Sequence, residues 1–175
     1  MITGSSSHRA SQARVQVPDV SKVYIEGIAA GLIGAATIAL WFLLLDALNG
    51  RPLYTPTVLG TALFRQSAGL DSSGNLDVSF EMVLMYTWVH TLVFCMIGGV
   101  ASKFIALAER DANLGFGILL FFVFFEFAFI VVALIFAEPV LHTLAWPAIL
   151  LGNLLAAGSM GAYFWRHHPD LAIRP

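Results

Sequence analysis

Residues 27–45 read GIAAGLIGAATIALWFLLL, with Glu26 before them and Asp46 after them, and they contain no charged residue. An α-helix needs about 20 mostly apolar residues to cross the roughly 30 Å of hydrocarbon in a bilayer, so this stretch is long enough to span a membrane. The whole chain shares this character, because 58% of its 175 residues are hydrophobic and only 11% are charged. A soluble domain carries about 25% charged residues. The sequence therefore excludes a water-soluble globule and predicts an integral membrane protein.

Three further segments are long and apolar enough to cross a bilayer, which gives predicted spans at residues 24–48, 81–107, 112–137 and 143–165. Backbone polar groups in lipid must be hydrogen-bonded within the protein, and so few strands could not close a barrel. The predicted fold class is therefore all-α, a polytopic four-helix transmembrane bundle formed by residues 24–166. Polar tails at residues 1–23 and 167–175 flank this domain.

The distribution of basic residues predicts the orientation. Seven of the nine Lys and Arg residues lie in the N-terminal tail, in the link between the second and third spans, or at the C-terminal end. The other two, Arg51 and Arg65, lie in the loop that follows the first span. Because cytoplasmic segments carry an excess of Lys and Arg, we expect both termini to be cytoplasmic.

The outer loop, residues 49–79, contains a predicted short helix. The loop begins with Asn49-Gly-Arg-Pro, which is a strong turn signal. Thr55 has the character of an N-cap and Pro56 that of a first helical residue, so we expect a helix over residues 56–66. Its apolar face consists of Val58, Leu59, Ala62 and Leu63. We expect this helix to lie in the membrane interface or to fold back onto the bundle as a re-entrant helix.

Small residues recur at helix-packing spacings in the first and last spans, at Gly27, Gly31 and Gly34 and at Ala157 and Gly161. Small side chains let the backbones of two membrane helices approach closely, and van der Waals contact then holds the helices together. The structural interpretation is packing within the bundle. The alternative is an interface with a partner subunit or with a second copy of the chain.

Polar residues at bilayer depth form a first candidate site. An ionisable residue there costs about 2.5–3.5 kcal/mol or more. At 1.5 Å per helical residue, His90 lies about 13 Å below the outer end of the second span, and Glu126 lies about 21 Å above the cytoplasmic end of the third. Asn153 and Thr37 reach a similar depth in their spans. Each predicted helix therefore contributes one polar group near the midplane.

The pair of His90 and Glu126 has three interpretations. It is a hydrogen-bonded contact that locks two helices together, or a proton or ion relay, since histidine titrates near neutrality and burial raises a carboxyl pKa. The third interpretation makes His90 a metal or haem ligand. A bis-His haem would need a second histidine at matching depth in another span, and the sequence has none there.

A second candidate group lies at the predicted outer ends of the four helices, at Asp46, Glu81, Glu138 and His142. Three carboxylates and an imidazole are a possible ligand set for a hard cation or a metal pair. However, Pro139 interrupts the helical spacing between Glu138 and His142. The simpler interpretation is charged residues at an aqueous boundary, with Arg51 neutralising the carboxylates.

Conventional enzyme motifs are absent from the sequence, which has no Gly-x-Ser-x-Gly, phosphate loop, His-Glu-x-x-His or Cys-x-x-Cys. The lone Cys95 cannot form a disulfide within the chain. A net charge of −2 provides no basic field for nucleic acid. We therefore assign no catalytic residue, no cofactor and no bound metal, and the sequence disfavours an enzyme.

The first span and the following loop contain a series of short motifs: Gly31-Leu-Ile-Gly34, Ala39-Leu-Trp-Phe42, Asp46, Gly50-Arg-Pro-Leu53, Thr55-Pro56 and Leu59-Gly60-x-Ala-Leu-Phe64. This pattern resembles one found in small four-helix integral membrane proteins of bacteria that have no assigned activity. The resemblance covers about a fifth of the chain. It implies a multi-pass protein of the bacterial inner membrane, and it transfers no functional residue.

The function that the sequence predicts is that of an accessory or scaffolding subunit of the inner membrane. Such a subunit packs in the lipid bilayer against a larger membrane complex or against a second copy of itself. The first alternative is a proton- or ion-coupled transporter that uses His90 and Glu126. The second alternative is a metal- or haem-dependent membrane redox protein.

Overall fold

The computed structural model of the chain describes residues 20–65, 77–108 and 146–168. The regular elements in these ranges are the helices α1 (Val20–Leu48), α2 (Tyr54–Phe64), α3 (Phe80–Ala108) and α6 (Trp146–His167), and the ranges contain no strand. The predicted third span, residues 112–137 with Glu126, lies outside the described residues, as do Glu138, His142 and most of the two tails.

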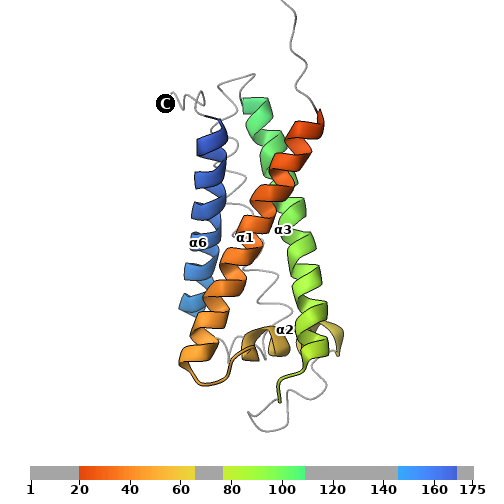
Figure 1. Cartoon of the computed structure of the whole chain (residues 1–175), viewed down its shortest axis with the longest axis vertical. Helices are drawn as coiled ribbons and strands as arrows, with labels where there is room; N and C mark the ends of the chain where they lie inside the picture. Colours follow the sequence, from red (N-terminus) through yellow and green to blue (C-terminus); the bar gives the residue numbers. More distant parts are fainter. Residues whose placement is uncertain (1–19, 66–76, 109–145, 169–175) are drawn as a thin grey trace, which may run out of the picture.

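The three long helices stand side by side, and α1 packs against both α3 and α6 (Figure 1). α1 runs in the direction opposite to α3 and α6 (Figure 1). One end of the bundle, which we call the terminal end, holds the start of α1 and the ends of α3 and α6. The other end, the loop end, holds the end of α1, the starts of α3 and α6, and α2, which lies across it (Figure 1).

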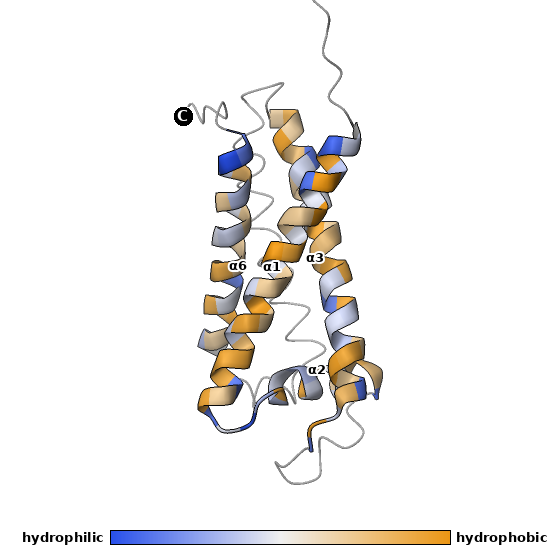
Figure 2. Ribbon diagram, viewed as in Figure 1, coloured by the Kyte–Doolittle hydropathy of each residue, from blue (hydrophilic) through white to orange (hydrophobic). Residues whose placement is uncertain are grey.

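Three helices are long and apolar enough to cross a membrane: Ser21–Leu48, Phe80–Ala108 and Pro147–His167. Hydrophobic residues occur along the full length of all three (Figure 2). Many large apolar side chains point outward, including Leu40 (65% exposed), Leu84 (72%) and Leu154 (67%). Water would disfavour such a surface by about 25 cal/mol per Å². The all-helical membrane-protein class and three of the predicted apolar helices are therefore confirmed.

Glycines let α1 approach α3 at backbone distance. A Cβ atom added to Gly27 would lie 2.6 Å from the Cα atom of Gly99, and one added to Gly31 would lie 2.6 Å from the Cα atom of Cys95. Real Cβ atoms do not come this close, so only glycine fits at these two positions. Near the terminal end the Ser102 hydroxyl donates a hydrogen bond of 2.7 Å to the Val23 carbonyl across the same interface.

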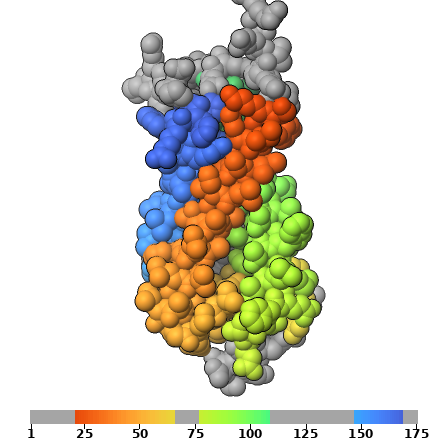
Figure 3. Space-filling model, viewed as in Figure 1, coloured from red at the N-terminus to blue at the C-terminus, as the bar shows by residue number. Residues whose placement is uncertain are grey.

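The contact between α1 and α6 combines apolar packing with hydrogen bonds. Met160 and Phe164 of α6 form a buried cluster with Ala30 of α1. Farther toward the loop end, the Trp41 indole nitrogen donates a hydrogen bond of 2.9 Å to the Ala148 carbonyl. The Trp41 ring lies against Gly152, which leaves the space that a side chain would otherwise fill. In the space-filling view α1 crosses the molecule between α6 and α3 (Figure 3).

The loop-end helix α2 begins earlier than the sequence predicts. Its first residue is Tyr54 and its N-cap is Leu53, whose φ of 66° is left-handed, so the predicted pairing of a Thr55 cap with a first-turn Pro56 is wrong. The reason is that the Thr55 N–H and hydroxyl bond to a side chain of α1 instead, as described below. The helix ends at Phe64, before the predicted residue 66.

Candidate functional site

The midplane candidate His90 lies on α3, ten residues from its start, which is about 15 Å along the helix axis. Its ring stacks on Tyr86, with centroids 5.5 Å apart, and meets Phe94, with centroids 4.8 Å apart. The backbone of Ala35 in α1 also interacts with the imidazole. The Nε2 atom is buried and has no hydrogen-bond partner among the described residues. The imidazole therefore lies between two aromatic rings of its own helix, with one ring nitrogen unpaired among the described residues.

The other described midplane candidates do not meet His90. Thr37 forms a hydroxyl–hydroxyl hydrogen bond of 3.0 Å with Ser159 of α6, and it donates to the Ile33 carbonyl at 2.7 Å. Asn153 is half-buried on α6, one turn and a half before Ser159. No hydrogen bond among the described residues joins Thr37 or Asn153 to His90. At this depth Thr37 and Ser159 connect two helices, and the described polar groups do not converge on one point.

At the loop end, Asp46 is part of a clamp between α1 and α2. Its carboxylate is buried (6% exposed) and accepts two hydrogen bonds of 2.7 Å, one from the Thr55 N–H and one from the Thr55 hydroxyl. Backbone N–H groups in the first turn of a helix lack partners within the helix, and the helix dipole favours a negative charge there. Asp46 therefore caps α2 from a distance of nine residues along the chain.

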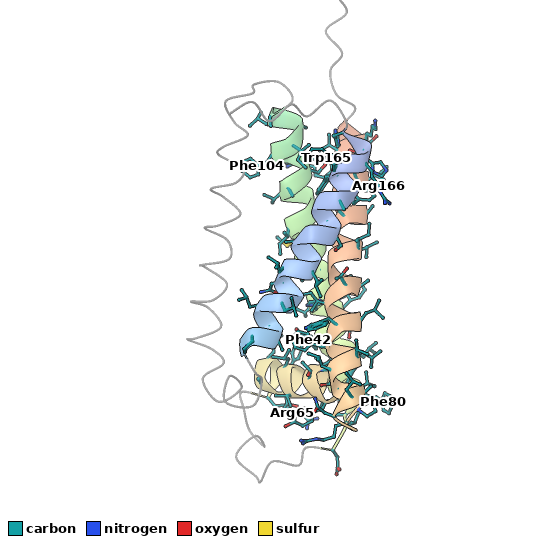
Figure 4. The ribbon with its side chains drawn as sticks, turned by 90° about the vertical axis from the view of Figure 1, so that its left-hand side faces the viewer. Phe42, Arg65, Phe80, Phe104, Trp165 and Arg166 are labelled. Atoms are coloured by element: carbon teal, nitrogen blue, oxygen red, sulfur yellow. The ribbon has the colours of Figure 1, made fainter. Side chains whose placement is uncertain are left out.

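The side chains of Glu81 and Arg51, the other described members of the predicted outer group, contact residues other than the Asp46 carboxylate. Glu81 forms an ion pair with Arg65 at 3.6 Å, and both side chains are more than half exposed. The guanidinium of Arg51 lies over the Tyr54 ring, 4.8 Å from its centroid. Figure 4 shows Arg65 and Phe80 at the loop end, on different sides of it in this view. In the described ranges no three His, Cys, Asp or Glu residues are placed to hold a metal ion.

The terminal end contains a charged contact that the sequence analysis missed. Glu26 is buried (8% exposed), and its carboxylate lies 3.1 Å from the Nε2 atom of His168 at the end of α6. Lys22, one turn earlier in α1, lies 3.8 Å from the other carboxylate oxygen. A carboxylate at the edge of a span and a histidine at the end of the last span were the only sequence signals. Their pairing depends on the two helix ends lying together.

The predicted packing residues occupy two different environments. Gly27, Gly31 and Gly34 are buried, and Gly34 lies against Met160 and Phe94. Ala157 is half-buried, Gly161 is exposed, and neither Gly158 nor Gly161 has a described atom within reach of an added Cβ. Both glycines lie on one exposed stripe of α6, the open face, which consists of Leu154, Gly158, Gly161, Ala162 and Trp165.

Comparison of the chain with protein-family models, with curated proteins and with solved structures found no match.

Proposed function

We propose that this protein is an accessory or scaffolding subunit of the bacterial inner membrane, which docks through the open face of α6. The docking partner is a larger membrane complex or a second copy of the chain. In this proposal the chain crosses the membrane four times with both termini in the cytoplasm. α2 lies in the interface on the opposite side.

The observation that carries this proposal is the open face itself. On α1, glycines at helix-packing spacing are covered by the backbone of α3. On α6, Gly158 and Gly161 are exposed between the exposed bulky residues Leu154 and Trp165. Membrane helices associate where small residues let backbones approach, because lipid provides no hydrophobic force between them. Two exposed glycines on one stripe are therefore suited to close contact with a helix of another subunit.

The positions of the described helix ends support the fourth span. Ala108 lies at the terminal end and Trp146 at the loop end, on opposite ends of the bundle (Figure 1). In this proposal the segment that links α3 to α6 crosses the bilayer as the fourth span. The apolar composition of residues 112–137 is what such a crossing through lipid requires.

The proposal is tested by affinity purification in a mild detergent, followed by mass spectrometry of the co-eluting proteins. The variant is Gly161→Leu, because an added side chain meets no described atom and the isolated bundle should tolerate it. The matched control is Ala39→Leu on an exposed position of α1. We expect Gly161→Leu to reduce recovery of the partner about tenfold, which corresponds to about 1.4 kcal/mol, and Ala39→Leu to leave it unchanged.

The co-eluting proteins distinguish the two kinds of partner in this proposal. Stoichiometric larger subunits support a place in a complex, and a second copy of the chain supports a homo-oligomer. Elution of the wild type as a monomer alone contradicts the proposal. Equal recovery with Gly161→Leu and Ala39→Leu shows that the partner does not use the open face.

The unsatisfied Nε2 atom of His90 favours a second candidate function, proton- or ion-coupled transport. A histidine that exchanges protons inside a membrane is a recurring part of proton relays. Its predicted partner Glu126 lies outside the described residues. The test reconstitutes the wild type and His90→Gln into vesicles that contain a pH-sensitive dye, under an imposed potential. Transport predicts proton flux that the variant abolishes, and equal dye signals with protein-free vesicles contradict it.

A further inference from the structure

The helix α2 has an unusual distribution of polar side chains for an element at the surface. Its sequence, YTPTVLGTALF, contains no charged residue. The residues buried against the bundle are Thr55, Thr57, Val58, Gly60 and Thr61, so three of the five carry hydroxyl groups. The opposite side carries Pro56 and Leu59, which are half-buried, and Leu63, which is 55% exposed. α2 therefore buries three hydroxyl groups together with Val58, against which Leu59 packs, and it leaves Leu63 exposed.

The inward hydroxyl groups are all satisfied within the protein. Thr57 donates to the Leu53 carbonyl at 2.8 Å, and Thr61 donates to the Thr57 carbonyl at the same distance. The Thr55 hydroxyl donates to Asp46. Gly60 lies against the backbone of Met82 in α3, which brings the two helices into close contact. α2 is thus held to the bundle by close packing and one clamp, and the hydroxyl groups of its three buried threonines need no water as a partner.

The residues around the outward side of α2 indicate whether water or lipid covers it. Leu63 is accompanied at the loop end by Phe64 (37% exposed), Val78 (41%) and Phe80 (76%). Arg51 precedes α2 and Arg65 follows it, and both are exposed. A helix in water presents polar residues outward, whereas a helix at a bilayer boundary presents apolar residues to the acyl chains. Arginines beside such a helix complement the negative charge of lipid phosphates, because their long side chains reach the headgroup level.

We infer that the outward side of α2, at Pro56 and Leu63, lies against the acyl chains of the phospholipid leaflet at the loop end. This inference rests on the proposed interfacial position of α2 and names lipid as the partner of that face. The bilayer then supports α2 from outside while Asp46 and Met82 support it from within. The inference does not depend on any protein partner of the open face.

The experiment places single spin labels in the full-length chain after Cys95→Ala, which removes the one native cysteine. The labelled variants are Leu63→Cys in α2, Leu84→Cys on the exposed surface of α3, and Asn49→Cys in the turn before α2. Each is reconstituted into vesicles of phosphatidylcholine and phosphatidylglycerol. Collision with oxygen, which concentrates in lipid, is compared with collision with a water-soluble nickel chelate. Elution at the wild-type volume confirms that each variant is folded.

We expect the label at position 63 to collide preferentially with oxygen, as the label at position 84 does. A preference for the nickel chelate, as at position 49, would show that α2 faces water and would overturn the inference. Protection from both reagents would show that protein covers the face, which overturns it as well. Because all three labels are read on the purified chain, this result is independent of whether Gly161→Leu affects partner recovery.

Discussion

α1 and α6 contain similar small-residue patterns, and the structure uses them differently. α1 is packed on two sides, with Gly27 and Gly31 against α3 and with Gly34 against Met160 of α6. Among the described elements α6 packs mainly against α1, and Gly158 and Gly161 on its other side meet no described atom. The comparison shows that a glycine pattern identifies a helix that can be approached closely. It does not identify the neighbour, because helix rotation is set by the packing of the whole bundle.

The largest expected effect comes from filling the packed glycine face with Gly31→Leu. The new side chain would enter the backbone of Phe94 and Cys95, and neither can move without separating α3 from α1. Overpacking a core costs about 1–3 kcal/mol and sometimes more, and we expect the upper end of that range or misfolding. The measurement is the midpoint of unfolding in an SDS titration, followed by circular dichroism. A midpoint equal to that of the wild type would show that the α1–α3 contact does not hold the bundle.

The second effect tests whether α1 organises the loop end as well as the bundle. Asp46→Ala removes the acceptor of both Thr55 hydrogen bonds and leaves buried donors unpaired. A buried group without its partner costs about 1–3 kcal/mol. We expect a lower SDS midpoint together with faster proteolysis between residues 49 and 79. Asn49→Ala, which removes an exposed hydrogen bond to the Leu45 carbonyl, is the control and should change neither readout.

A smaller effect is expected at the hydroxyl–hydroxyl contact between α1 and α6. Thr37 and Ser159 are 3.0 Å apart, and interhelical hydrogen bonds in membranes average about 0.6 kcal/mol. A double-mutant cycle with Thr37→Val and Ser159→Ala should give a coupling energy of about that size. Additive single effects would mean that each hydroxyl serves only its own helix, through the carbonyls of Ile33 and Ala156.

The smallest expected effect comes from the open face. Gly158→Leu places a side chain where no described atom is in reach, and leucine is the better helix former by about 0.5–1 kcal/mol. The SDS midpoint of the purified chain should therefore stay the same or rise slightly, in contrast to Gly31→Leu. A large fall in the midpoint would place Gly158 inside the folded bundle and remove the basis of the proposed docking surface.

The sequence predicted the elements better than their contacts. An uncharged run bounded by Glu26 and Asp46 is sufficient to place α1, because the thickness of the bilayer fixes the length of a span. The Asp46 clamp could not be predicted, since it depends on a left-handed turn residue, Leu53, that the Thr55-Pro56 signal obscured. The prediction that Arg51 neutralises Asp46 missed the threonine that supplies both of the hydrogen bonds to its carboxylate.

The candidate site was predicted less completely, because its contacts between helices are not encoded locally in the sequence. His90 was identified from the free-energy cost of an ionisable residue at bilayer depth, and its aromatic neighbours Tyr86 and Phe94 follow from helical spacing within α3. Which polar group another helix would offer depends on rotation, so Thr37 meets Ser159 and not His90. The contact between Glu26 and His168 joins residues 142 positions apart, and no local pattern indicates it.

That long-range contact has a consequence for biosynthesis. The chain is made from its N-terminus, so the carboxylate of Glu26 enters the membrane region long before His168 has left the ribosome. Until then, among the described residues, the carboxylate has the exposed Lys22 beside it, at 3.8 Å. A nascent or truncated chain that ends before residue 168 leaves this carboxylate at the edge of the bilayer without its imidazole. Arrival of the last helix therefore supplies the imidazole partner of a carboxylate on the first helix.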